Sequence, residues 1–571
     1  MGETIGPRSG PPPGKGALVP AVAWLARYER PWLRADVVAG LTTAAVVIPK
    51  AMAYATIAGL PVEVGLYTAL VPMAVYVILG TSRVLSVSTT TTISILCGSA
   101  LGAVVPQGES AALATASATL TLMVGAILVL ARVLRLGFVA NFISEPVLAG
   151  FKAGIGLVIV VDQAPKLLGL HYDKAGWFRD IAALVRHLPD TSLPTLAVGA
   201  ATLVVVFGLE HFAPRLPSPL LAVGGGIAAS AFLGLQASGV AVVGHIPGGL
   251  PGLVRPDLGL LEALWPAAVA IALMSFTETI AAGRAFTASG EPRPDPNQEL
   301  VATGAATLLG GLVGAMPAGG GTSQTAVNRK AGARTQVAAL VTAAVTLATL
   351  LFLAPLMGLI PQAALAAVVI ATSVGLVSPA DFRAIRRVRT VEFRWALVAC
   401  VGVVLLGTLK GILAAVVLSM LSLLHMANNP PVYVMRRKRG TDAFRPESAE
   451  HPDDESFPGL LILRTEGRVY FGNAQNIGDG IWPLVLAARP RVLLLDCGGI
   501  PGFEFTALKM LGEAEAKLRE QGIELWLAAL SREALEMVRR TPLGERLGEE
   551  RMYFTVPQAV EEYVGRRSLA P

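Results

Sequence analysis

The chain has 571 residues, of which 53% are hydrophobic and only 15% are charged, and its mean hydropathy is +0.60. Soluble proteins carry about 25% charged residues, so the composition excludes an ordinary soluble protein and indicates a membrane protein. The formal net charge of +6 does not indicate nucleic-acid binding. The basic residues gather in short loops between apolar stretches, which is how membrane topology is set.

The first 34 residues are expected to form a cytoplasmic N-terminal segment. Residues 1–18 are rich in Pro and Gly and lack the apolar stretch of a signal peptide. Residues 21–34 have amphipathic spacing, with aromatic residues on one side and arginines on the other, so we expect them to lie at the membrane surface.

Residues 35–428 are expected to form a transmembrane domain of about fourteen helical spans. The Lys and Arg residues concentrate in alternate loops, which places both termini in the cytoplasm and predicts a multi-pass protein of the cell membrane. The third and tenth spans are shorter than the roughly 20 residues that cross a bilayer. They hold matching positions if the domain consists of two halves of seven spans, and paired interrupted spans indicate the binding site of a transporter.

The third span opens with hydroxyl-bearing residues. Ser88 precedes Thr89, Thr90, Thr91 and Thr92, after which an apolar run continues to about residue 105. Threonine is a poor helix former but a good N-terminal cap, so the run predicts the start of a broken span. Thr89, Thr90 and Thr91 are therefore candidate ligands of a substrate.

The tenth span contains three consecutive glycines, Gly319 to Gly321, which oppose helix formation by roughly 1 kcal/mol each. Non-helical backbone at membrane depth persists only where it is buried in protein or lines a watery cavity. A helix that restarts near Thr322 directs free N–H groups and its positive dipole end into that cavity, which suits an anion. The candidate ligands in this stretch are Gly320, Gly321, Thr322, Ser323 and Gln324.

Ionisable residues inside apolar spans are functional candidates by default. Lys50 is expected to bind the anion or to neutralise Glu278, and Tyr54 is expected to donate a further hydrogen bond or to pack. Glu278 is the candidate coupling residue, which would carry a proton, bind sodium or pair with Lys50. Lys152 is expected to reach the interface or to make a gate contact.

The composition changes beyond Arg439. Residues 429–456 are expected to be a linker, and residues 457–571 alternate predicted strands and helices, which indicates a small cytoplasmic α/β domain. Strands are predicted over 460–463, 491–496 and 523–528, and helices over 506–521 and 531–540.

Several short motifs, in order along nearly the whole chain, resemble the SulP (sulfate permease) family of anion transporters. They include residues 36–40, 48–54, 65–67, 80–83, 146–151, 297–300 and 323–328. Residues 470–474 and 495–499 resemble the STAS domain that such transporters carry. The resemblance implies a seven-plus-seven inverted repeat, a core domain that moves against a gate domain, a homodimer, and a substrate between the third and tenth spans.

The chain departs from the family pattern at four places. Gln324 stands where the family usually has Arg, and Lys50 stands where it usually has Gln. Threonines replace the usual Gly-Pro before the third half-helix, and Phe505 replaces the phosphorylatable Ser of the STAS domain.

These features predict secondary active transport of a small anion, coupled to a proton or sodium gradient. Sulfate is the family default, and bicarbonate or a dicarboxylate is the alternative. A passive anion channel, a membrane-anchored signalling scaffold and a nucleobase permease are further possibilities. Cys97, Cys400 and Cys497 are scattered without metal-ligand spacing, and no nucleophile–base pair or phosphate loop stands out. We therefore expect no enzyme activity, no cofactor, no metal and no nucleic-acid partner.

Overall fold

A computed structural model describes residues 19–26, 28–105, 110–141, 144–172, 177–213, 216–288 and 290–568. Residues 1–18 of the expected N-terminal segment lie outside these ranges. The chain divides into two compact units, residues 1–419 and 420–571. The division falls within helix α18 (Thr408–Asn428).

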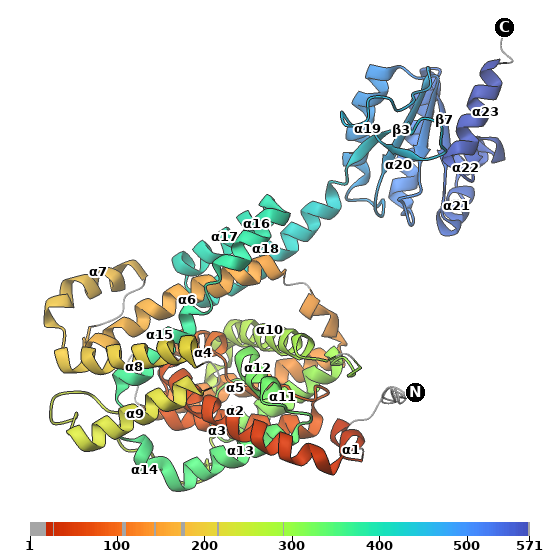
Figure 1. Ribbon diagram of the computed structural model, residues 1–571. Coiled ribbons are helices and arrows are strands. Elements are labelled where there is room, and N and C mark those ends of the chain that lie inside the picture. Colours follow the sequence, from red (N-terminus) through yellow and green to blue (C-terminus); the bar gives the residue numbers. More distant parts are fainter. Residues whose placement is uncertain are drawn as a thin grey trace, which may run out of the picture. The chain divides into compact units, whose positions relative to one another are not determined.

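The first unit is helical, which confirms the predicted class of a polytopic α-helical membrane protein (Figure 1). Eight helices of the described part are long and apolar enough to cross a membrane. This number is lower than fourteen because several expected spans are short helices, such as α4 (Thr91–Val104), α9 (Ser218–Leu233) and α12 (Thr322–Lys330). Two further helices, α7 (Trp177–His187) and α16 (Pro379–Val388), were not among the expected spans, and neither contains a buried residue.

The helices of this unit pack in two groups. The first group is formed by α2 (Arg30–Ile57), α3 (Val62–Leu79), α4, α5 (Ser110–Val133), α10 (Leu261–Ala285), α11 (Pro296–Leu312), α12 and α13 (Val337–Ala348). The second group is formed by α6 (Glu145–Leu168), α8 (Leu193–Phe212), α9, α15 (Gln362–Val374) and α17 (Thr390–Leu406). The groups meet where α2 contacts α9 and α15 and where α4 contacts α6.

Two buried carboxylates tie loops of the first group together. Asp36 at the start of α2 accepts hydrogen bonds from the backbone N–H groups of Arg334 (2.6 Å) and Thr335 (3.1 Å). Glu299 in α11 accepts hydrogen bonds from the backbone N–H of Thr81 and from the hydroxyl of Tyr76, each at 2.8 Å. Both carboxylates are fully buried, so these bonds supply the polar contacts that water would otherwise make.

The second unit is built on a six-stranded sheet in the order β4-β3-β5-β6-β7-β8, in which β5 to β8 are parallel. The strands are β3 (Val432–Arg437), β4 (Phe444–Pro446), β5 (Leu460–Thr465), β6 (Val492–Asp496), β7 (Glu524–Ala528) and β8 (Met552–Tyr553). Helices α19 (Ala474–Ala488) and α20 (Phe505–Glu520) pack on one face, and α23 (Val556–Ser568) packs on the other. Helices α21 (Arg532–Arg539) and α22 (Pro542–Leu547) complete the unit.

The stretch that we expected to be a linker, 429–456, contributes two strands to this sheet. β3 pairs antiparallel with β4 and with β5. β4 is the edge strand and β3 is its neighbour, and arginines of both strands pair with carboxylates, as in Arg445 with Asp454. Such charge-rich edge strands look polar in sequence, which is why they resemble a linker.

Candidate functional site

The two interrupted spans meet through a short pair of strands. β1 (Val87–Ser88) runs antiparallel to β2 (Gly319–Gly320), with Val87 opposite Gly320 and Ser88 opposite Gly319. Helix α4 begins three residues after β1, and α12 begins two residues after β2. The two helix N-termini, each with backbone N–H groups that have no partner within the helix, therefore start beside the same strand pair.

The glycines of β2 permit close contact with its neighbours. A Cβ on Gly320 would stand 2.7 Å from the Cα of Thr279 in α10, and one on Gly319 would stand 2.7 Å from Cδ1 of Ile93. The Gly320 N–H donates a hydrogen bond of 2.9 Å to the hydroxyl of Thr279. The glycine run thus places the start of α12 directly against α10, which no larger residue allows.

The start of α4 uses its threonines in part for its own structure. Thr90 is the N-cap and accepts a hydrogen bond from the N–H of Ile93 (3.2 Å). The hydroxyl of Thr89 is buried and lies 2.9 Å from that of Ser94. Thr91 is also buried. Thr90 is half-buried and is the most accessible of these three threonines.

Gln324 connects the two interrupted spans. Its Oε1 accepts hydrogen bonds from the hydroxyls of Ser88 (3.0 Å) and Ser86 (3.3 Å), and its Nε2 donates to the carbonyl of Thr89 (3.4 Å). The side chain is 1% exposed. In this conformation the amide therefore holds α12 to β1, and it presents neither polar atom to a ligand.

Lys50 lies beside the first turn of α12. It stands in the middle of α2, and its Nζ donates to the hydroxyl of Ser323 at 3.5 Å. The side chains of Thr322 and Ser323 are exposed and Lys50 is half-buried, so this end of α12 faces open space. Among the described residues, no carboxylate lies within 4 Å of Lys50, and the acidic residue that acts on it electrostatically is Glu210 of α8.

Tyr54 follows Lys50 by one helical turn on α2, so both side chains lie on one face of that helix. Tyr54 is 4% exposed. Tyr54 belongs to the hydrophobic core that also contains residues of α4 and α15.

Glu278 lies in α10 and is buried against the start of α4. Its Oε2 accepts a hydrogen bond of 2.7 Å from the hydroxyl of Thr90. The cation whose field reaches Glu278 is Lys152 of α6, which belongs to the second helix group. Sequence reasoning paired Glu278 with Lys50 and did not connect it to Lys152.

The structure gathers the sequence-predicted residues into three clusters. The first set borders open space and consists of Lys50, Thr322 and Ser323. The second is the hydrogen-bonded pair of Thr90 and Glu278. The remaining candidates serve mainly as internal contacts: Tyr54, Thr89, Thr91, Gly320, Gly321 and Gln324. Sequence reasoning placed Lys152 at the interface or at a gate contact and did not link it to Glu278, and it missed Thr279 and Glu210. Glu210 carries a signal in the sequence, because it is a carboxylate near the end of an apolar helix. No group of three His, Cys, Asp or Glu residues suited to a metal ion occurs in the described ranges.

The chain matches two family models. One, described as the sulfate permease family, matches residues 33–399, and one described as the STAS domain matches residues 451–559. A probable sulfate transporter of Mycobacterium tuberculosis is 33% identical over 548 residues, which cover 95% of this chain and 98% of that protein. The high affinity sulfate transporter 1 of Stylosanthes hamata is 28% identical over 96% of this chain and 86% of its own length.

Solved structures share the fold at lower sequence identity. The murine anion transporter Slc26a9 in its inward-facing state aligns with a TM-score of 0.86 at 21% identity, over 95% of this chain and 93% of that chain. The transmembrane domain of a cyanobacterial bicarbonate transporter, BicA, aligns with a TM-score of 0.59 at 22% identity, over 69% of this chain and 98% of that chain.

Proposed function

Because the chain belongs to the sulfate permease family of membrane anion transporters, we propose that it is a secondary active transporter with sulfate as its first candidate substrate. Two of the curated relatives described above carry sulfate transport in their names. Bicarbonate and a dicarboxylate are the alternatives, and the name of the BicA structure supports the first of these.

One observation carries the proposal, namely the convergence of two helix N-termini beside a lysine. α4 and α12 start at the same strand pair, and Lys50 stands 3.5 Å from Ser323 in the first turn of α12. Free N–H groups and the positive dipole ends of helices stabilise an anion. Lys50 adds a full charge, so an oxyanion at this position exchanges its hydration shell for backbone donors, the Ser323 hydroxyl and one ammonium group.

Coupling to a gradient is assigned to Glu278. This carboxylate of α10 is 7% exposed and accepts a hydrogen bond from Thr90, the N-cap of α4. It is also subject to the electrostatic field of Lys152 in α6. α4 and α10 belong to the first helix group and α6 belongs to the second. Movement of one group against the other therefore changes the surroundings of Glu278, and binding of a proton or sodium ion there biases that movement.

The remaining features of the proposal concern the cellular setting. We place the chain in the cell membrane, with both termini in the cytoplasm, from the distribution of Lys and Arg between loops. We also propose a homodimer, and the mass of the purified complex in lipid nanodiscs tests that assembly.

Reconstitution into liposomes tests the transport function. Labelled sulfate, bicarbonate and succinate are offered under an imposed proton gradient, an imposed sodium gradient or neither. We expect sulfate to accumulate above its equilibrium distribution under one of the two gradients. Currents without accumulation under either gradient would identify a passive anion channel instead, and the absence of flux for all three anions would contradict anion transport by this site.

A further inference from the structure

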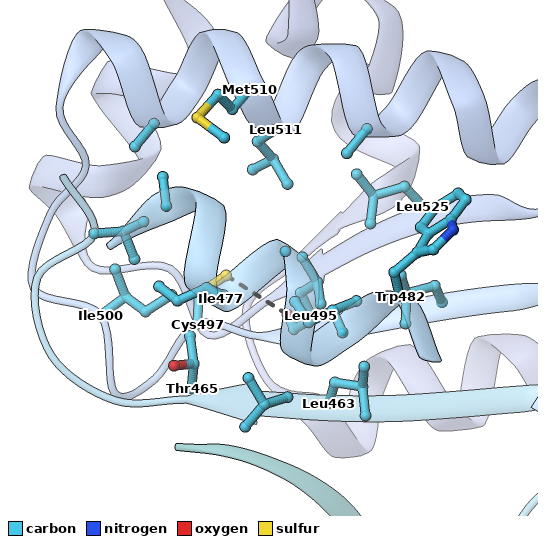
Figure 2. Close-up of a pocket in the computed structure, with 18 of the residues that line it drawn as sticks. Leu463, Thr465, Ile477, Trp482, Leu495, Cys497, Ile500, Met510, Leu511 and Leu525 are labelled. Atoms are coloured by element: carbon cyan, nitrogen blue, oxygen red, sulfur yellow. Dashed lines mark hydrogen bonds between the residues drawn. The ribbon is translucent and has the colours of Figure 1, made fainter. Parts of the chain in front are cut away.

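The second unit contains a cavity of about 420 Å³ between its sheet and helices α19 and α20 (Figure 2). Its floor is formed by Leu463, Leu495 and Leu525 of the three central strands. Helix α20 contributes Met510 and Leu511, and helix α19 contributes Ile477, Gly478, Asp479, Ile481 and Trp482. Figure 2 shows the side chains of Leu511 and Leu525 directed into the same space. A volume of 300–1,000 Å³ with mainly apolar walls is typical of sites for small molecules.

The local sequence keeps this space open. Gly478 of α19 lines the cavity, and a Cβ placed on it would meet no atom within 4 Å. Protein interiors are close-packed, and unfilled apolar space forfeits dispersion contacts. A molecule bound in this cavity would therefore supply the dispersion contacts that its lining residues lack.

The charges that line the cavity select against an anion. Two cations and three carboxylates border it, namely Arg464, Lys517, Asp479, Asp496 and Glu513, which gives a net charge of 2 − 3 = −1. The guanidinium of Arg464 lies 3.6 Å from Asp496 and 3.9 Å from Glu466, so its charge is compensated by carboxylates of the chain. Burial, and then the neighbouring Asp496, raise the pKa of the Cys497 thiol to about 12, so Cys497 adds no charge at neutral pH.

One lining residue offers a hydrogen bond that nothing in the described structure accepts. The Nε atom of Arg464 is buried and makes no hydrogen bond among the described residues, and Glu466 Oε1 lies 3.9 Å away from it, beyond hydrogen-bonding distance. A buried donor without an acceptor is unfavourable. A ligand oxygen would satisfy it, and the surrounding charges require that this oxygen be uncharged.

We propose that this cavity binds a small uncharged amphiphile, with an aliphatic body between α19, α20 and the sheet and a hydroxyl or carbonyl oxygen as its polar group. The site is separate from the proposed transport site, because all of its lining residues belong to the unit of residues 420–571. It would not accept the transported anion, since its lining is apolar and its net charge is negative.

Photolabelling of the full-length protein in lipid nanodiscs tests the proposal. The probe is decan-1-ol bearing a diazirine on its chain, and the matched probe is decanoate with the same diazirine. Labelled peptides are identified by mass spectrometry. We expect the alcohol to label peptides of α19 and α20, unlabelled decan-1-ol to compete, and decanoate to label these peptides at least tenfold less.

Two tryptophan substitutions provide the control. Gly478→Trp places a large side chain at the border of the cavity, whereas Gly565→Trp places the same side chain on α23, where a Cβ also meets no atom within 4 Å. We expect Gly478→Trp to reduce labelling of α20 at least tenfold and Gly565→Trp to leave it unchanged. If Gly478→Trp prevents folding, competition by unlabelled decan-1-ol still decides the outcome. Labelling confined to the membrane helices, labelling that decan-1-ol does not reduce, or equal labelling by decanoate would overturn the proposal.

Discussion

The two units of the chain hold their buried carboxylates in different ways. In the membrane unit, Asp36 and Glu299 are fully buried and accept hydrogen bonds from backbone N–H groups and hydroxyls. In the second unit, arginine pairs with the carboxylates instead. Arg546 pairs with the buried Glu515 (2.7 Å), and Arg445 pairs with Asp454 (2.7 Å) at the edge of the sheet.

The way in which carboxylates are satisfied in the membrane unit affects which cations are available at the proposed anion site. Because neutral donors satisfy Asp36 and Glu299, these two carboxylates draw no cation into an ion pair. Lys50 illustrates the result, because its short contact is a hydroxyl, Ser323, rather than a carboxylate. The comparison therefore predicts that removal of membrane-unit charges affects transport or folding strongly, whereas removal of a surface pair in the second unit has little effect.

The largest effect is expected from Lys50→Gln. The substitution removes the ammonium group that bonds to Ser323 at the start of α12, and hydrogen bonds to charged groups contribute about 1.5–3 kcal/mol. We expect binding of labelled sulfate in nanodiscs to weaken roughly 10- to 100-fold. Lys330→Gln at the opposite end of α12 is the matched control and should retain wild-type affinity. Equal affinities for the wild type and Lys50→Gln would remove Lys50 from the site.

The second effect concerns coupling. Glu278→Gln keeps the shape of the side chain but abolishes its charge, so ion binding no longer biases movement of the helix groups. We expect the liposome accumulation ratio for sulfate to fall to its equilibrium value while exchange of sulfate for sulfate continues. Glu262→Gln, near the start of the same helix α10 and exposed, should accumulate sulfate normally. Retained accumulation in Glu278→Gln would assign coupling to another residue.

A third effect tests how neutral donors hold a buried carboxylate. Glu299→Gln turns one acceptor oxygen into an NH₂ group that faces donors from Thr81 or Tyr76. An unsatisfied buried group costs about 1–3 kcal/mol, so we expect a lower midpoint of thermal unfolding for the purified protein. Tyr76→Phe removes one donor and should lower the midpoint less. If Glu299→Gln unfolds at the wild-type midpoint, these hydrogen bonds do not stabilise the loop.

The smallest effect is expected at the edge of the second unit. The pKa of Asp454 is lowered, and the hydrogen bond from Arg445 is the largest cause. The pair therefore stabilises the folded protein at pH values above the unfolded-state pKa of about 3.9. That contribution is lost as pH falls through the lower native pKa. Arg445→Met should therefore change acid unfolding only slightly, and added salt should reduce the difference further. A shift as large as that of Glu299→Gln would break the comparison between the units.

The sequence predicted the positions of the interrupted spans well because their causes are local. Threonine caps and consecutive glycines act within a few residues, and α4 and α12 begin at Thr91 and Thr322, within the predicted stretches. The strands β5, β6 and β7 and the helices α20 and α21 also lie within about two residues of the predicted ranges, because alternation of apolar residues is likewise local.

Contacts between distant segments could not be read from the sequence. The electrostatic influence of Lys152 on Glu278 and of Glu210 on Lys50 depends on how α6 and α8 pack against the first helix group. The role of Gln324 illustrates the same limit, because its hydrogen bonds to Ser86 and Ser88 depend on the pairing of β1 with β2. Polar residues near an expected site can serve as ligands or as scaffold, and only the tertiary structure distinguishes these roles.

The position of a bound heavy oxyanion tests the central claim most directly. Selenate has the shape and charge of sulfate, and its selenium can be located in an experimental structure of the full-length protein by anomalous scattering. We predict one selenate between the N-termini of α4 and α12, within hydrogen-bonding distance of Lys50 and of the backbone N–H groups at Thr322 and Ser323. Selenate bound elsewhere, with the space beside Lys50 and Ser323 unoccupied at saturating concentration, would contradict the account.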